Sequence, residues 1–162
     1  MMDLHRDLDP RLDTSTPLKP ANAVAAIIVM GGDYLLQLRD NKQGIFFPAH
    51  WGCFGGAPEA GETREEALVR ELYEELAIVL EPAIFRYFTR FEFDLSFAGL
   101  APIWRYFYEI ELAASRLADL RLQEGSAMQL FSADEVLTAT VPLTPYDSFA
   151  LWFHINRGRL KV

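Results

Sequence analysis

The first two apolar runs of the chain predict a buried β-hairpin. Residues 23–30 are a continuous run of small and branched apolar side chains. Residues 31–33, Gly-Gly-Asp, follow as a turn, and apolar positions resume over residues 34–39. Two short apolar runs joined by a glycine turn are typical of a hairpin whose strands lie in the core.

A helix over residues 64–76 is the firmest local prediction. Thr63 can cap its first turn, and Glu66 stands three residues later, which completes a capping box. Acidic residues in the first turn also suit the helix dipole. A loop over residues 41–50 and a short strand around Cys53 are predicted before this helix.

The second half of the chain predicts more strands than helices. Residues 84–95 and 103–112 are rich in aromatic and branched side chains and read as two long strands, with a shorter strand over residues 127–131. A short helix capped by Ser132 and a last apolar helix over residues 146–156 follow. Strands before, between and after helices predict an α/β fold in which helices sandwich a mixed sheet.

The aromatic side chains of the last helix recur at helical spacing, and we expect them in the core. They are Phe149, Trp152 and Phe153.

Composition narrows the class of protein. The chain has 162 residues, 51% of them hydrophobic, which is enough for one domain over residues 21–162 preceded by an extended, proline-containing arm over residues 1–20. A net charge of -8 disfavours binding to nucleic acid. The single cysteine, Cys53, excludes an intrachain disulfide, and no apolar run reaches membrane-spanning length, so a cytoplasmic location without membrane contact is expected.

Three carboxylates share one narrow face of the predicted helix. With Glu71 at zero on a helical wheel, Glu74 falls about 60 degrees to one side and Glu75 about 40 degrees to the other. The apolar stripe that contains Leu68 and Leu72 borders this face, so the charges are costly unless a cation offsets them. Hard ions such as Mg²⁺ take carboxylate and carbonyl oxygens, so a magnesium site beside the nearby glycines is one interpretation of this face. The other, and for helical spacing alone the more common one, is a plain acidic surface helix.

The segment from Gly56 to Ile78 reads GAPEAGETREEALVRELYEELAI. It resembles the box of the Nudix family, Gly-x5-Glu-x7-Arg-Glu-U-x-Glu-Glu-x-Gly-U, where U is a bulky aliphatic residue. The matching positions are Gly56, Glu62, Arg70, Glu71, Leu72, Glu74, Glu75 and Ile78. Only the last glycine differs, because residue 77 is alanine here. A residue other than glycine in the left-handed conformation at a helix end lowers the stability of the fold by about 1 to 2 kcal/mol.

The resemblance implies a Nudix-type α/β/α sandwich and a hydrolase that uses Mg²⁺ or Mn²⁺. It implies that Glu71, Glu74, Glu75 and the carbonyl of Gly55 bind metal. Glu74, Glu75 and Arg70 would take part in catalysis, with Arg70 as an orienting ion-pair partner. Gly56 and Glu62 would brace the loop before the helix.

Residues outside the box are open to more than one interpretation. Glu124, in a loop just before a strand, is the candidate for a further acidic catalytic residue or ligand; Glu92, Asp94, Glu109 and Glu111 are weaker alternatives. Arg39, Phe47 and Trp51 are the candidate substrate-binding residues, because an arginine can reach a phosphate and aromatic faces can stack a base or sugar. Each of these also has a plain structural interpretation, as a surface charge or as part of the core.

The expected activity is hydrolysis of the diphosphate linkage of a nucleoside diphosphate derivative: a nucleoside triphosphate, a nucleotide sugar or ADP-ribose. The alternative is a non-catalytic Nudix-like module that binds a nucleotide and regulates a partner. An isopentenyl diphosphate isomerase fits poorly, because its catalytic cysteine would stand at Gly55 rather than at Cys53. The aromatic content and the arm are compatible with a homodimer.

Overall fold

The computed structural model describes residues 14–160. Seven strands form one sheet in the order β3-β2-β1-β6-β5, with β4 paired to β1 and β7 paired to β2. The strands are β1 (Ala23–Met30), β2 (Asp33–Leu38), β3 (Trp51–Gly52), β4 (Phe54–Gly56), β5 (Arg86–Phe93), β6 (Ile103–Leu112) and β7 (Ala127–Phe131). The central strands β1 and β6 run parallel and the other pairs are antiparallel, so the sheet is mixed, as predicted.

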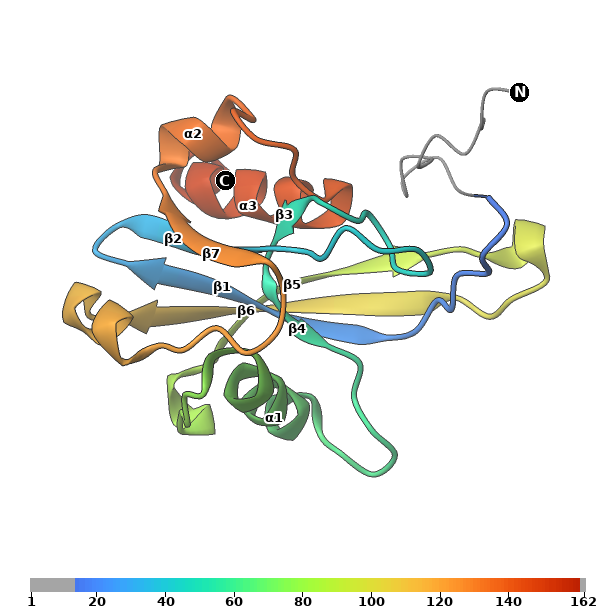
Figure 1. Cartoon of the computed structure of the whole chain (residues 1–162), viewed down its shortest axis with the longest axis horizontal. Helices are drawn as coiled ribbons and strands as arrows, with labels where there is room; N and C mark the ends of the chain where they lie inside the picture. Colours follow the sequence, from blue (N-terminus) through green and yellow to red (C-terminus); the bar gives the residue numbers. More distant parts are fainter. Residues whose placement is uncertain (1–13, 161–162) are drawn as a thin grey trace, which may run out of the picture.

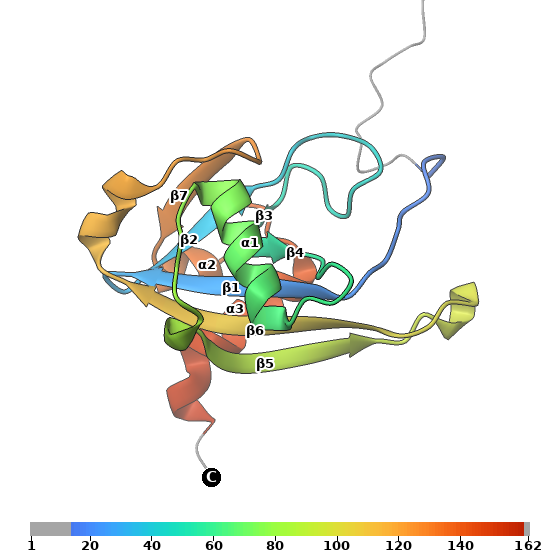
Figure 2. The same cartoon turned by 90° about the horizontal axis from the view of Figure 1, so that it is seen from below.

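Helices cover both faces of the sheet (Figure 1). The helix α1 (Arg64–Leu76) lies on one face, while α2 (Ala133–Leu137) and α3 (Pro145–Asn156) lie on the other. Figure 2, which views the molecule from below, shows α1 lying across the sheet. This arrangement confirms the predicted α/β/α sandwich.

The side chains of β1 divide the core into two parts. Val24, Ala26 and Ile28 are buried in the cluster that contains Leu68 and Leu72 of α1. Ala25 and Ile27 are buried in the cluster that contains Leu151 of α3. Because successive side chains of a strand point to opposite faces, a strand that is apolar throughout needs a helix on each side.

The predicted core position of the α3 aromatics is wrong for two of them. Phe149 is 55% exposed and Trp152 is 43% exposed, while Phe153 is partly buried. The face that α3 turns toward the sheet consists of smaller or polar residues. They are Asp147, Ala150, Leu151, His154 and Asn156.

Two strand boundaries also differ from the prediction. The strand expected over residues 84–95 begins at Arg86, because Pro82–Ile84 forms a short 3-10 helix, and it ends at Phe93 before a second 3-10 helix, Ser96–Ala98. Gly99, between the two predicted strands, adopts the left-handed conformation where the chain reverses into β6.

Most of the predicted arm, residues 1–13, lies outside the described residues. In the described part, residues 14–22 carry no strand. No helix between residues 14 and 160 has the length and apolar character needed to cross a membrane.

Candidate functional site

A cavity of about 490 Å³ opens where β2, the end of α1 and the loop before β7 meet. Polar and charged side chains dominate its wall. It is lined by Gln37, Arg39, Asp40, Lys42, Ile45, Gly55, Glu71, Glu75, Gln123, Glu124 and Gly125. Three carboxylates of the predicted site, those of Glu71, Glu75 and Glu124, therefore face one cavity.

Glu75 is the most buried acid of the site, with 5% of its surface exposed. Its Oε1 accepts a hydrogen bond from Gln37 Nε2 at 2.6 Å, and its Oε2 accepts one from the backbone N–H of Gly55 at 2.8 Å. Burial raises the pKa of this carboxyl to about 7 in spite of these two hydrogen bonds, which lower it. A carboxylate held this way gains more than an exposed one from a cation bound beside it.

Glu71 lies at the junction of α1 with β4. Burial raises the pKa of its carboxyl, and Arg70 opposes that effect. A Cβ on Gly56 would come within 2.5 Å of the Glu71 carboxylate. Glycine at position 56 thus leaves the space that this carboxylate occupies, which gives a physical reason for the first position of the box.

Gly55 could not be replaced without moving the sheet. Its φ of 132° lies in the region that favours glycine, and a Cβ there would stand 2.1 Å from the carbonyl oxygen of Val24 on β1. The same residue lines the cavity and donates to Glu75. Close packing of β4 against β1 therefore fixes one donor to the Glu75 carboxylate.

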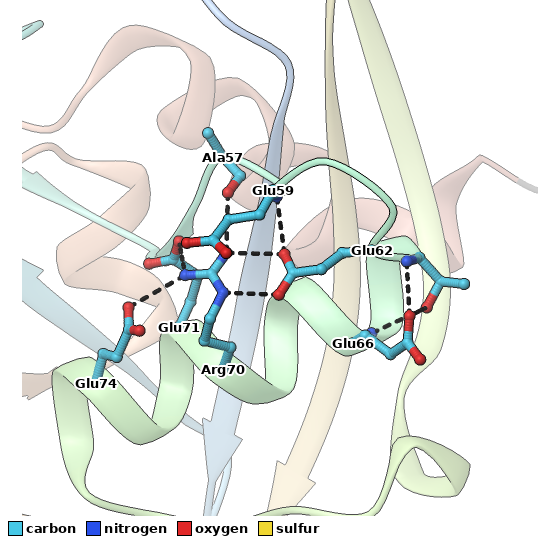
Figure 3. A network of polar contacts seen from close by, with 8 residues as sticks. Ala57, Glu59, Glu62, Glu66, Arg70, Glu71 and Glu74 are labelled. Atoms are coloured by element: carbon cyan, nitrogen blue, oxygen red, sulfur yellow. Dashed lines mark hydrogen bonds and ion pairs between the residues drawn. The ribbon is translucent and has the colours of Figure 1, made fainter.

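Arg70 is the centre of a polar network at the start of the site (Figure 3). Its Nε and one terminal nitrogen donate to the two oxygens of Glu62 at 2.8 and 3.0 Å. Its other terminal nitrogen donates to Glu71 at 2.8 Å and to Glu74 at 3.1 Å. The carbonyl of Ala57 accepts a further bond at 3.0 Å, so the planar guanidinium links the loop to two acids of the helix.

Glu62, the predicted loop brace, contacts the backbone of the loop as well as Arg70. Besides binding Arg70, its carboxylate accepts a hydrogen bond from the backbone N–H of Glu59 at 2.8 Å. The side-chain hydrogen bond from Arg70 is the main reason that the pKa of Glu62 falls to about 2. The charged form of Glu62 is therefore the one that holds the loop.

Glu74 is placed differently from Glu71 and Glu75. Its side chain is 46% exposed, contacts Arg70 and is not among the residues that line the cavity. Its role as a metal ligand stays a prediction.

The loop before β7 is bound to the end of α1. The backbone N–H groups of Arg121 and Gln123 donate to the carbonyls of Leu76 and Glu75 at 2.9 and 2.8 Å, and the Gln123 side chain donates to the carbonyl of Tyr73 at 3.1 Å. The bonds to Leu76 and Glu75 satisfy carbonyls that a helix end leaves free, while the Tyr73 carbonyl also accepts the N–H of Ala77. They also hold Glu124 at the cavity, near enough to Glu71 and Glu75 to raise the pKa of both carboxyls.

Ala77 ends α1 in the left-handed conformation, with φ 55° and ψ 28°. The helix therefore ends as it would with glycine, and the alanine bears the strain. We predict that Ala77→Gly raises the free energy of unfolding by about 0.5 to 1 kcal/mol, the relief of strain less the greater entropy of an unfolded glycine. Urea unfolding measures this difference. Ala77→Ser, which keeps a Cβ, is the control, and equal stability of the two variants would contradict the explanation.

The three candidate substrate-binding residues are dispersed. Arg39 lines the cavity, and its Nε donates to the carbonyl of Phe46 at 2.8 Å, which ties the predicted loop to β2. Phe47 packs instead against Tyr146 of α3, with ring centroids 5.6 Å apart. Trp51 is buried against Phe131 and does not line the cavity, so its expected contact with substrate is corrected to a place in the core.

The weaker acidic alternatives lie elsewhere. Glu109 contacts His154 and Arg157 on the α3 side of the sheet. Asp94 accepts a hydrogen bond from the backbone of Ser96 at the turn after β5. Cys53 is buried, its pKa raised by burial, which agrees with a structural role rather than an isomerase nucleophile.

Some residues of the cavity were absent from the prediction. Gln37 is buried on β2 and contacts Glu75 from 38 positions away in the chain. A Cβ on Gly125 would stand 2.6 Å from Gln37 Oε1, so this glycine leaves room for that amide. The signal for Gln37 in the sequence is a polar residue between the apolar residues Leu36 and Leu38.

The donor set fits a magnesium ion. Between residues 14 and 160, no three His, Cys, Asp or Glu side chains form a group that could hold a metal by themselves. Magnesium, however, usually binds through one or two carboxylates together with waters and substrate phosphates. Glu71 and Glu75, two carboxyls whose pKa burial raises beside the same cavity, supply such a pair.

Comparison with known proteins identifies the family. The family model of the NUDIX domain matches residues 19–151. Nucleoside triphosphatase NudI of Enterobacter sp. (strain 638) is 44% identical over 64 residues, which cover 40% of this chain and 45% of that protein. The chain thus spans less than half of the length of the curated relatives it matches.

Solved structures agree over a greater length. The E. coli ORF135 protein is 27% identical with a TM-score of 0.66, over 91% of this chain and 96% of that one. The NUDIX domain of Shewanella oneidensis NrtR, solved with ADP ribose, is 20% identical with a TM-score of 0.63 over 94% of each chain, a likeness that shows the fold alone. Since the family match covers most of the chain and contains the whole site around Arg70, the chain belongs to the NUDIX family.

Proposed function

We propose that this chain is a magnesium-dependent hydrolase that cleaves the diphosphate linkage of a nucleoside diphosphate derivative. The observation that carries this proposal is the convergence of Glu71, Glu75 and Glu124 on a cavity that Arg39 and Lys42 also line. A diphosphate is bound by acidic side chains that hold a cation and by positively charged side chains that contact the phosphate oxygens.

Each residue has a definite part in this proposal. Glu71, Glu74, Glu75 and the carbonyl of Gly55 would hold Mg²⁺, or Mn²⁺ in its place. When bound, the ion supplies positive charge for the diphosphate and acidifies the attacking water. Arg70 keeps Glu71 in position, and Gly56 and Glu62 keep the loop in position.

Glu124 and Arg39 act on the reacting groups themselves. Glu124 lies on the loop at the cavity wall and would accept the proton of the attacking water, as a general base. Arg39 would donate to a phosphate oxygen with its terminal nitrogens, because its Nε is already engaged by Phe46. Phe47 is outside the cavity wall, so contact with substrate would require the loop to shift.

Nucleoside triphosphates are the first substrate class to test, since the curated relatives are named nucleoside triphosphatases. Nucleotide sugars and ADP-ribose carry the same diphosphate and follow. A cytoplasmic location is part of the same proposal, since a single cysteine forms no intrachain disulfide.

The deciding experiment measures phosphate, diphosphate and nucleotide release from these three classes, with Mg²⁺ and with excess EDTA. We expect turnover of at least one class with Mg²⁺ and none with EDTA, because the acids alone repel an anionic substrate. Binding of a nucleotide without any release would favour the regulatory module, and release that persists in EDTA would contradict a metal-dependent reaction.

A further inference from the structure

The strand β5 is an edge of the sheet, and its side toward α3 carries Phe88 and Phe91. It pairs with β6 alone among the described strands, so the backbone groups of its outer side are free to pair with another strand. On the α3 side of the sheet, Phe91 of β5 packs against Phe149, with ring centroids 5.4 Å apart. Phe149 in turn packs against Phe153 at 4.8 Å.

An aromatic strip therefore runs from the edge strand onto α3. We call Phe91, Phe149, Trp152 and Phe153 the aromatic strip. Two of its members are exposed, Phe149 at 55% and Trp152 at 43%, and the outer side of α3 has no charged residue between Asp147, which is buried, and His154. A contiguous exposed apolar patch is a mark of contact with another protein surface.

The charged residues of β5 in one copy are complementary to those of β5 in an antiparallel second copy. Arg90 and Glu92 flank Phe91 and are both exposed. Their side chains point to the α1 side of the sheet. The guanidinium carbon of Arg90 lies 4.6 Å from the ring centroid of Trp104, and the Trp104 ring lies beside that of Tyr106. Arg64 of α1 stacks over Tyr106. In an antiparallel pair of two β5 strands centred on Phe91, Arg90 of each copy would stand opposite Glu92 of the other.

Exposed apolar residues also lie just beyond both ends of β5. The hairpin between β5 and β6 projects from the body of the molecule (Figure 2), and Phe97 at its tip is 86% exposed. Ile84, which lies just before the other end of β5, is 39% exposed. A two-fold axis normal to the sheet also keeps both α3 helices on one side, so the two aromatic strips would face each other.

We propose that the chain forms a homodimer by antiparallel pairing of β5 with β5 of a second copy, with the aromatic strips packed together across the two-fold axis. The cavity lies around β2 and the end of α1, away from the β5 edge of the sheet. It therefore stays open in this dimer. The proposal does not depend on the proposed hydrolysis.

The test is the mass of the full chain in solution, measured by light scattering on a sizing column over a series of protein concentrations. We expect a dimer for the natural chain. Arg90→Glu and Glu92→Arg should each weaken it by at least about tenfold, because each variant sets two pairs of like charges opposite each other. The double variant R90E/E92R should restore the dimer, a result that a general loss of folding cannot produce.

The aromatic strip is tested in the same way. Trp152→Ser should weaken the dimer, whereas Val79→Ser, which removes a 68% exposed apolar residue beyond α1, should not. The proposal is overturned by a monomer at every concentration, or by a dimer that both single charge variants leave unchanged. In the second case another surface joins the copies.

Discussion

Glu75→Gln is expected to reduce turnover of the preferred nucleotide by about 10³-fold, or about 4 kcal/mol in the activation free energy. The substitution removes the charge of the most buried acid of the cavity and changes its size little. The proposed cation would lose an anionic oxygen, and the developing charge on the diphosphate would be stabilised less. Steady-state rates at saturating Mg²⁺, for the natural chain and the variant, measure the effect.

Folding of this variant needs its own control. Both Glu75 oxygens accept hydrogen bonds, one from Gln37 and one from the backbone N–H of Gly55. In the variant an NH₂ group replaces one of these oxygens, so two donors face each other there. An unmatched buried donor costs about 1 to 3 kcal/mol, and urea unfolding shows whether the variant stays folded. Glu81→Gln, at an exposed glutamate, is the matched control for activity. A folded Glu75→Gln variant with the natural rate would contradict the proposed role.

Much of the fold follows from local pattern. The continuous apolar run of β1 required cover on both faces, and the capping box at Thr63 placed the start of α1. Strand ends were less well predicted, because the 3-10 helices around β5 depend on proline and on chain reversal rather than on alternation. Phe149 and Trp152 show the same limit: helical spacing places them on one face but does not say which face turns to the sheet.

The acids of the site were predictable for a similar reason. A helix fixes the relative directions of Glu71 and Glu75 without any knowledge of the rest of the protein. The partners of these acids come from distant segments: Gln37 reaches Glu75 from β2, and Gln123 binds the end of α1 from the loop before β7. Such contacts arise only when the sheet is assembled, so local spacing contains no record of them.

Trp51 illustrates how a loop residue can mislead. An aromatic residue just before the glycines suggested a surface for stacking a base. In the structure Trp51 pairs with Leu38 of β2 on one side, and its backbone binds residues 142–144 on the other. Its ring lies in the core beside Phe131. Short strands of two residues give almost no alternation, and their inward side cannot be told from sequence.

Arg70→Lys is expected to lower turnover by about 10- to 100-fold although it preserves the charge, the usual loss when a group that orients a ligand is changed. The guanidinium donates to Glu62, Glu71 and Glu74 and to the carbonyl of Ala57 in a fixed planar fork. A lysine ammonium has three donors at a single nitrogen and cannot span these acceptors. Arg70→Ala should lose more activity and also lower the urea midpoint, because it leaves three neighbouring carboxylates without their cation.

The comparison between the two variants separates orientation from charge. If the charge of Arg70 were its main contribution, Arg70→Lys would keep the natural rate and only Arg70→Ala would lose it. Arg116→Lys, at a surface arginine that pairs with Asp119, is the control and should change neither rate nor midpoint. The affinity of Arg70→Lys for Mg²⁺, measured by titration calorimetry, separates two explanations of a lower rate. An unchanged affinity would mean that the Arg70 guanidinium acts through the position of Glu71 in the reacting complex. A weaker affinity would mean that the guanidinium positions the carboxylates before the cation binds.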